Sequence, residues 1–170
     1  EAGWLEGNIL INIDSEQEGE IYMGCAGGID AEATFKLIFE DVTQDFTSFT
    51  LSLSGLKGGH SGVDIDTGRA NANKLLVRFL LDASQNFDLR LVDLNGGSLR
   101  NAIPREADAS FVIAAKDVSA FKLSLDDYLD RLRATLGSIE TDIEMLLISP
   151  EVFDQCWSLK TQSLILNALN

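Results

Sequence analysis

The sequence has 170 residues, of which 45% are hydrophobic and 24% are charged, and its formal net charge is -14 from 27 acidic and 13 basic residues. This composition is typical of a folded globular protein, and the acidity argues against non-specific nucleic-acid binding, which needs a basic surface. There is no apolar run of about 18 residues and no basic segment followed by an apolar stretch, so neither a membrane span nor a signal peptide is predicted.

The first predicted element is a strand over residues 8–14, whose near-continuous apolar run suits a strand buried on both faces of an α/β sheet. The run ends at Asp14, and open α/β sheets bind ligands and metals just beyond the carboxyl ends of their strands. Asp14 is therefore a candidate oxygen ligand for a metal, although an acid in a solvated loop would give the same pattern. A second short strand is expected over residues 20–24.

The rest of the chain alternates one-sided strands with amphipathic helices. Alternating apolar residues indicate strands, and apolar residues spaced i, i+3, i+4 indicate helices. The predicted strands cover residues 34–39, 47–54, 89–94, 109–115 and 139–147, and the predicted helices cover residues 72–80 and 121–136. From Thr47 to Ile148 the order is β-α-β-β-α-β, which predicts an α+β fold: a ferredoxin-like antiparallel sheet with both helices on one face.

A further helix is predicted at the end of the chain. Ser149 suits an N-cap and Pro150 suits the first helical position. The chain opens without an initiator methionine and closes inside this apparently helical pattern, so we expect it to be a fragment of a longer protein.

His60 is the only histidine, and it lies in a glycine-rich turn, Gly55–Gly62, between a predicted strand and a predicted helix. Imidazole is the side chain best suited to donate or accept a proton near neutral pH, and flanking glycines allow a ligand to approach closely. A lone histidine is more often structural than functional, but this loop offers few ways to bury the ring. His60 is therefore the first candidate for a functional residue.

A second glycine-rich loop, residues 95–105, holds Asn101 between Arg100 and Arg105. An imidazole, an amide and guanidinium groups are what a site uses to hold a carboxylate or a developing oxyanion. The same loop could be a simple hairpin turn with solvated arginines. No HExxH, GxSxG or P-loop motif is present, and one carboxylate without histidine or cysteine partners cannot make a catalytic zinc site. The residues alone therefore predict only part of a catalytic site.

The two cysteines, Cys25 and Cys156, are far apart and lack the spacing of a zinc knuckle or a disulfide framework. They predict two buried free thiols in a reducing compartment, the cytoplasm.

Four stretches, residues 12–28, 55–62, 71–80 and 95–106, resemble the aminoacyl-histidine dipeptidases, a group of co-catalytic zinc peptidases related to carboxypeptidase G and the aminoacylases. The resemblance covers most of residues 1–115. It implies a catalytic domain with two zinc ions, interrupted by a ferredoxin-like lid. Residues 1–28 would then end the catalytic α/β domain, residues 29–148 would form the lid, and residues 149–170 would be a further, truncated lid helix.

The resemblance also implies roles for three residues: Asp14 as a ligand of one zinc, His60 as the group that stabilises the oxyanion, and Asn101 as a hydrogen-bond partner of the bound dipeptide. The implied activity of the full-length enzyme is hydrolysis of Xaa-His dipeptides such as β-alanyl-histidine, in the cytoplasm. Its partners would be the dipeptide, its own catalytic domain and, as one option, a second copy in a homodimer.

Because the general base and most zinc ligands belong to flanking segments of the family, the fragment is expected to be inactive alone and to bind no zinc firmly. The competing hypothesis is a ferredoxin-like module without catalysis. Such a module would hold a small anion at Asn101 or pair its exposed sheet edge with a second copy.

Overall fold

The computed structural model describes residues 6–9, 11, 18–24, 27–149 and 152–170, and the chain divides into two units, Glu1–Thr34 and Phe35–Asn170. The described residues of the first unit form neither helix nor strand. Of the strand expected over residues 8–14, residues 10 and 12–14, including Asp14, lie outside the described residues. Ile9 and Ile11 are exposed, not buried on both faces.

The strand expected over residues 20–24 is not formed, because these residues are irregular. A strand needs a neighbour to accept and donate its backbone hydrogen bonds, and no described residue pairs with this segment.

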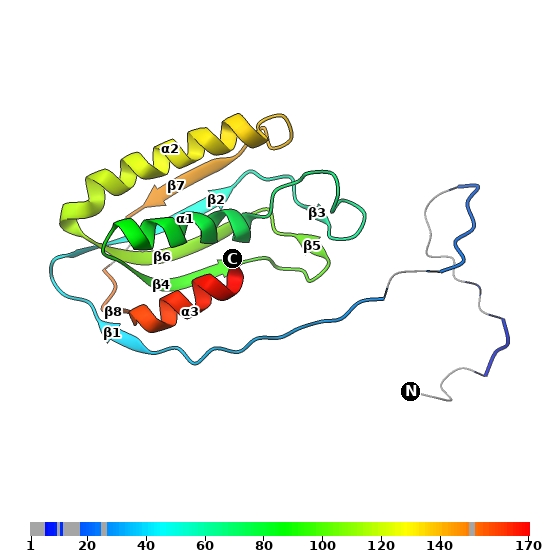
Figure 1. The fold of residues 1–170 in the computed structure, drawn as a ribbon, viewed down its shortest axis with the longest axis horizontal. Helices are drawn as coiled ribbons and strands as arrows, with labels where there is room; N and C mark the ends of the chain where they lie inside the picture. Colours follow the sequence, from blue (N-terminus) through cyan, green and yellow to red (C-terminus); the bar gives the residue numbers. More distant parts are fainter. Residues whose placement is uncertain (1–5, 10, 12–17, 25–26, 150–151) are drawn as a thin grey trace. The chain divides into compact units, whose positions relative to one another are not determined.

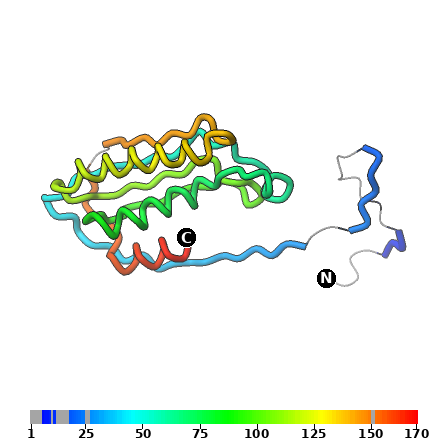
Figure 2. The backbone as a smooth tube through the Cα atoms, turned by 45° about the horizontal axis from the view of Figure 1, so that its top comes forward, coloured from blue at the N-terminus to red at the C-terminus, as the bar shows by residue number. Residues whose placement is uncertain are grey.

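The second unit is built on a four-stranded antiparallel sheet. Its strands are β2 (Phe46–Ser54), β4 (Leu89–Gly96), β6 (Ala107–Ala114) and β7 (Glu144–Ile148), in the order β4-β6-β2-β7. Helices α1 (Ala72–Asn86) and α2 (Val118–Leu136) cover one face, as Figures 1 and 2 show from two directions. This order and pairing confirm the predicted ferredoxin-like α+β fold.

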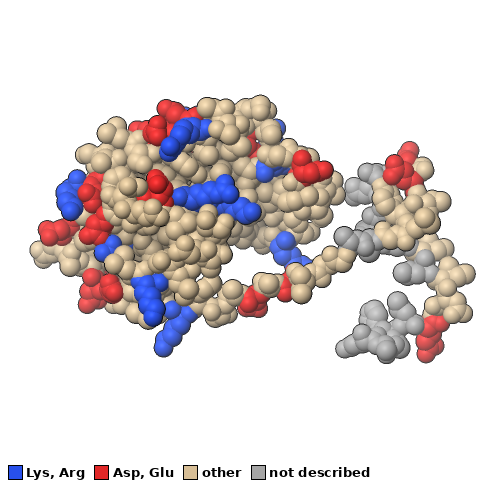
Figure 3. All heavy atoms as spheres, in the orientation of Figure 1, with Lys and Arg blue, Asp and Glu red and all other residues tan. Residues whose placement is uncertain are grey.

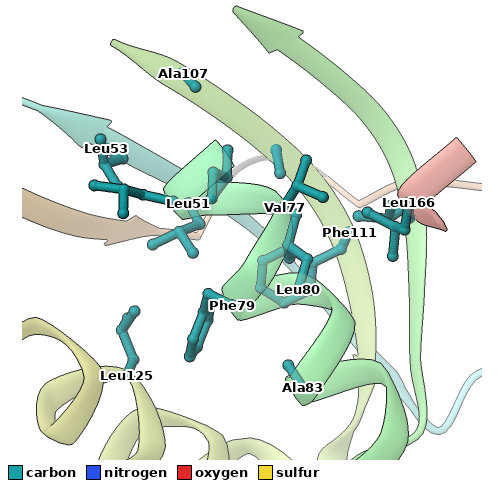
Figure 4. Packing of buried hydrophobic residues seen from close by; sticks show 14 of the residues in the cluster. Leu51, Leu53, Val77, Phe79, Leu80, Ala83, Ala107, Phe111, Leu125 and Leu166 are labelled. Atoms are coloured by element: carbon teal, nitrogen blue, oxygen red, sulfur yellow. The ribbon is translucent and has the colours of Figure 1, made fainter. Parts of the chain in front are cut away.

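The hydrophobic core lies between the sheet and the helices. Helix α1 buries residues at helical spacing, including Leu76, Phe79 and Leu80. Figure 4 shows Phe79 and Leu80 beside side chains from the sheet such as Leu51 and Phe111. The Phe121 ring of α2 lies 5.5 Å from Phe79 and 5.2 Å from Phe111 between centroids. The rings therefore join both helices to strand β6. Among the described residues, no helix is long and apolar enough to cross a membrane.

The remaining elements lie outside the ferredoxin-like order. Strand β1 (Phe39–Asp41) pairs antiparallel with β8 (Gln155–Trp157), a short 3-10 turn (Ala115–Asp117) precedes α2, and α3 (Leu159–Leu169) follows β8. Only the end of the segment predicted as a strand over residues 34–39 is a strand.

The helix predicted to start at Ser149 is misplaced. Residues 150–151 lie outside the described residues, but the helix begins at Leu159, with the Ser158 hydroxyl accepting a hydrogen bond from the Thr161 amide. The chain stays extended before it because β8 pairs with β1 and buries Cys156 and Trp157. Cys156 is a buried free cysteine, as predicted, and burial raises the pKa of its thiol. Cys25 lies outside the described residues.

Gln162 of α3 covers the outer edge of strand β4. Its amide oxygen accepts a hydrogen bond from the Leu91 amide at 2.7 Å, and its amide nitrogen donates to the Leu89 carbonyl at 3.2 Å. The side chain is buried and makes the two bonds that a neighbouring strand would make. The start of strand β4 therefore has β6 on one side and Gln162 on the other.

Candidate functional site

The two glycine-rich loops predicted to carry chemistry meet in a short β-ribbon. Strand β3 (Gly59–His60) pairs antiparallel with β5 (Ala102–Ile103), so His60 lies opposite Ala102. The Ser61 amide donates to the Asn101 carbonyl at 2.8 Å. Figure 1 shows this β3–β5 ribbon at one end of the sheet. The fold thus brings together His60 and Asn101, which are far apart in the sequence.

The loop that holds Asn101 is not a tight hairpin turn. Strand β4 continues through Gly96, and the chain then forms β5 before it returns as β6. Asn101 and Arg105 are exposed on this connection, as is Arg100. The simple-hairpin interpretation of the Asn95–Gly97 turn is therefore wrong.

The His60 ring is held by two backbone amides. The N–H groups of Gly62 and Val63 each donate to His60 Nδ1 at 3.1 Å. A ring nitrogen that accepts hydrogen bonds carries a lone pair, so the neutral ring bears its proton on Nε2. The side chain is exposed, and no described residue accepts a bond from Nε2. The loop therefore holds His60 with an exposed Nε2–H donor.

The backbone around His60 is fixed by an ion pair within the His60 loop (residues 57–70). Asp64 Oδ2 accepts from the His60 amide at 2.8 Å, and Asp64 Oδ1 lies 2.9 Å from Arg69, which also donates to the Gly58 carbonyl. A Cβ at Gly59, whose φ is +148°, would lie 2.4 Å from Arg69 Nη1. Glycine at this position therefore leaves room for the Arg69 and Asp64 side chains to pack against the backbone.

Sequence reasoning did not identify Asp64 or Arg69. The available signal was weak: two opposite charges in the same loop as a glycine-flanked histidine.

Cavities lie beside the β3–β5 ribbon. One, of about 530 Å³, is lined by residues from both loops, including Gly59 and Ile103, and by charges of both signs such as Lys57, Arg105 and Asp108. A second, of about 360 Å³, is lined by Ser61, Arg69 and again Ile103, among others. These volumes are in the range of small-molecule sites. Figure 3 shows acidic and basic side chains interspersed on the face it displays, so no patch of one sign defines the site there.

Apolar side chains are exposed in the same two loops. Val63 is 78% exposed, Ile65 66% and Leu99 64%. Each of the two loops therefore exposes at least one large apolar side chain.

The candidate metal ligand Asp14 lies outside the described residues. Within the part of the chain that the structure describes, no group of three or more histidine, cysteine or acidic side chains could hold a metal ion. His60 and Asn101 are thus brought together, while the structure leaves Asp14 as a prediction.

Comparisons with known proteins agree with this architecture. Residues 51–140 match the family model described as a peptidase dimerisation domain. The chain is 52% identical over 149 residues to the cytosol non-specific dipeptidase of Escherichia coli (strain K12). The aligned region covers 88% of this chain and 31% of that protein. It is also similar to the crystal structure of aminoacylhistidine dipeptidase from Vibrio alginolyticus, with a TM-score of 0.89 and 49% sequence identity. The match covers 100% of this chain and 35% of the Vibrio chain.

Proposed function

The chain belongs to the family of peptidase dimerisation domains, and from that premise we propose that it is the lid portion of a zinc-dependent dipeptidase acting on Xaa-His dipeptides such as β-alanyl-histidine. It spans 31% of the length of its Escherichia coli relative and 35% of its Vibrio relative, so hydrolysis is proposed for the full-length protein and not for this chain alone. The name of the Vibrio relative, aminoacylhistidine dipeptidase, supports the Xaa-His substrate class. The name of the Escherichia coli relative, cytosol non-specific dipeptidase, supports dipeptide hydrolysis and a cytoplasmic location.

We assign residues 1–28 to the end of a catalytic α/β domain, residues 29–148 to the lid, and residues 149–170 to a further lid segment. Ile9 and Ile11 support the first assignment, because they are 85% and 80% exposed and a parallel sheet formed with other segments would bury them.

The observation that carries the proposal is the hydrogen bonding of His60. Its two amide donors leave the Nε2–H as the free donor, which is the group needed to stabilise a tetrahedral oxyanion. Asn101, held beside it by the β3–β5 ribbon, is the proposed hydrogen-bond partner of the dipeptide.

The described residues do not fit a zinc site by themselves. We propose that the catalytic domain binds the two zinc ions, with Asp14 as the ligand from this chain. The chain alone is then expected to bind no zinc firmly.

Removal of metal tests the proposed activity. The full-length protein is expected to hydrolyse β-alanyl-histidine, to lose this activity on chelation, and to regain it when zinc is added. The matched control is the 170-residue chain, which is expected to be inactive with and without zinc. The proposal would be contradicted if the full-length protein released no histidine from any Xaa-His dipeptide. That result would favour the non-catalytic module.

The family description also favours pairing with a second copy. Among the described residues, strand β7 has a neighbour on one side only, and its Leu146 and Ile148 side chains are 60% and 46% exposed. We propose β7 as the edge through which two copies associate. Sedimentation of the full-length protein at micromolar concentration is expected to show a dimer, and a monomer there would contradict this part of the proposal.

A further inference from the structure

We propose that Glu140 is a positioning residue that holds the His60 loop in its working geometry; this inference rests on the function proposed above. Glu140 is fully buried. Its Oε2 accepts a hydrogen bond from the Lys57 amide and its Oε1 accepts one from the Ala70 amide, both at 2.8 Å. Lys57 and Ala70 are the two ends of the His60 loop, so a single carboxylate ties both ends together.

A carboxylate suits this position because it has two acceptor oxygens and no donor. Burying such a group is costly unless it is well paired, and no ion pair among the described residues involves Glu140. The two loop amides are therefore the interactions that offset its burial.

The turn that carries Glu140 is itself firmly placed. The amides of Ile139 and Glu140 both donate to the Leu136 carbonyl at 2.8 Å, at the end of helix α2. On the other side, Gly55 lies against the same turn: its φ is +78°, and a Cβ there would be 1.8 Å from the Asp142 carbonyl oxygen. The anchor of the His60 loop is thus part of the packed lid and not of a mobile tip.

The contacts form a path from Glu140 to the backbone amide of His60. Glu140 fixes the loop ends, and Arg69, next to Ala70, bonds both the Gly58 carbonyl and Asp64. Asp64 in turn accepts from the His60 amide. Releasing the ends would therefore move the Nε2–H donor, and a misplacement of about 1 Å at a catalytic group can cost about 10²-fold in rate.

The first test is Glu140→Gln in the full-length enzyme. Glutamine keeps the volume but offers one acceptor oxygen and an NH₂ group that faces an amide donor, so one loop end loses its bond. We expect kcat for β-alanyl-histidine to fall by about 10- to 10²-fold, with KM little changed because the lost interaction acts on the transition state. The control is Glu40→Gln, the same change at an exposed position of β1, which is expected to leave kcat unchanged.

A double-mutant cycle separates positioning from general destabilisation. In a His60→Ala background, Glu140→Gln is expected to lower kcat no further, because the group it positions is gone. An equal loss with and without His60 would overturn the proposal. If Glu140→Gln does not fold, Glu140→Asp, which keeps both acceptor oxygens on a shorter side chain, takes its place in the same cycle.

A second readout does not depend on enzyme activity. His60 is the only histidine of the 170-residue chain, and the second unit has its own hydrophobic core, so the imidazole nitrogen resonances of a tag-free sample report this ring alone. We expect the Nε2–H form to dominate in the wild type and the two tautomers to mix in Glu140→Gln. Unchanged resonances would overturn the positioning role, whereas an inactive wild-type full-length protein would overturn only the proposed function.

Discussion

Replacing His60 by alanine in the full-length enzyme is expected to lower kcat for β-alanyl-histidine by about 10²–10³-fold, the typical loss when one oxyanion donor is removed. The Gly62 and Val63 amides hold Nδ1, so the proton on Nε2 is the one available to the developing negative charge. Because the interaction strengthens only in the transition state, KM is expected to change little. Steady-state kinetics with β-alanyl-histidine measures both constants.

The same variant must remain folded for this result to be informative. His60 is exposed, and its ring hydrogen bonds stay within the loop, so the free energy of unfolding is expected to fall by no more than about 1 kcal/mol. An unchanged kcat would contradict the oxyanion role. A raised KM with normal kcat would instead assign His60 to substrate binding.

Replacing Phe121 by alanine is expected to lower the free energy of unfolding by about 3–5 kcal/mol, the usual cost of truncating a buried phenylalanine. The Phe121 ring is fully buried and contacts Phe79, Phe87 and Phe111, with centroid distances of 5.5, 5.9 and 5.2 Å. Removing the ring would leave a cavity where both helices meet the sheet. A domain is stable by about 5–15 kcal/mol in total, so this loss is a large fraction of it.

The matched control lies on the same helix. Leu123 is 71% exposed, and Leu123→Ala is expected to change the free energy of unfolding by less than about 0.5 kcal/mol. Urea unfolding followed by circular dichroism compares the two variants, and a similar loss in both would show that the core is not where the structure places it.

The periodicity of the sequence was sufficient to predict the ferredoxin-like unit, because most of its elements bury mainly one side. Strand β2 and helix α1 illustrate this: their buried residues repeat every second position and every third or fourth position, respectively. The prediction failed where burial comes from contacts distant in the sequence. Strand β8 forms because β1, more than one hundred residues earlier, pairs with it, and this pairing delays the last helix to Leu159.

Glu140 shows the same limitation at the candidate site. The alternation over residues 139–147 predicts a strand with Glu140 on its polar side, whereas residues 140–143 form a turn region and Glu140 is fully buried. Strand β7 begins only at Glu144. The amides that bind the Glu140 carboxylate are 83 and 70 positions away, and no local pattern indicates such partners.

The two loops of the candidate site were predicted from the sequence, and the roles of His60, Asn101 and Asp14 stay predictions. His60 and Asn101 were selected by their glycine-rich loops, and the β3–β5 ribbon brings them together. Their support by Asp64 and Arg69 could not be predicted, because it depends on a backbone path with positive φ at Gly58 and Gly59.

The amide of Gln162 has a consequence for how copies of this unit can associate. A sheet with two open edges can add strands on both sides and grow into a fibre, as edge-to-edge aggregates do. Here the start of β4 is occupied by Gln162, whereas the opposite edge of the sheet is formed by β7. An assembly joined β7 to β7 would be two-fold symmetric and would use the β7 edge of both copies. In such a pair, Gln162 would keep the start of each remaining β4 edge from adding a further strand.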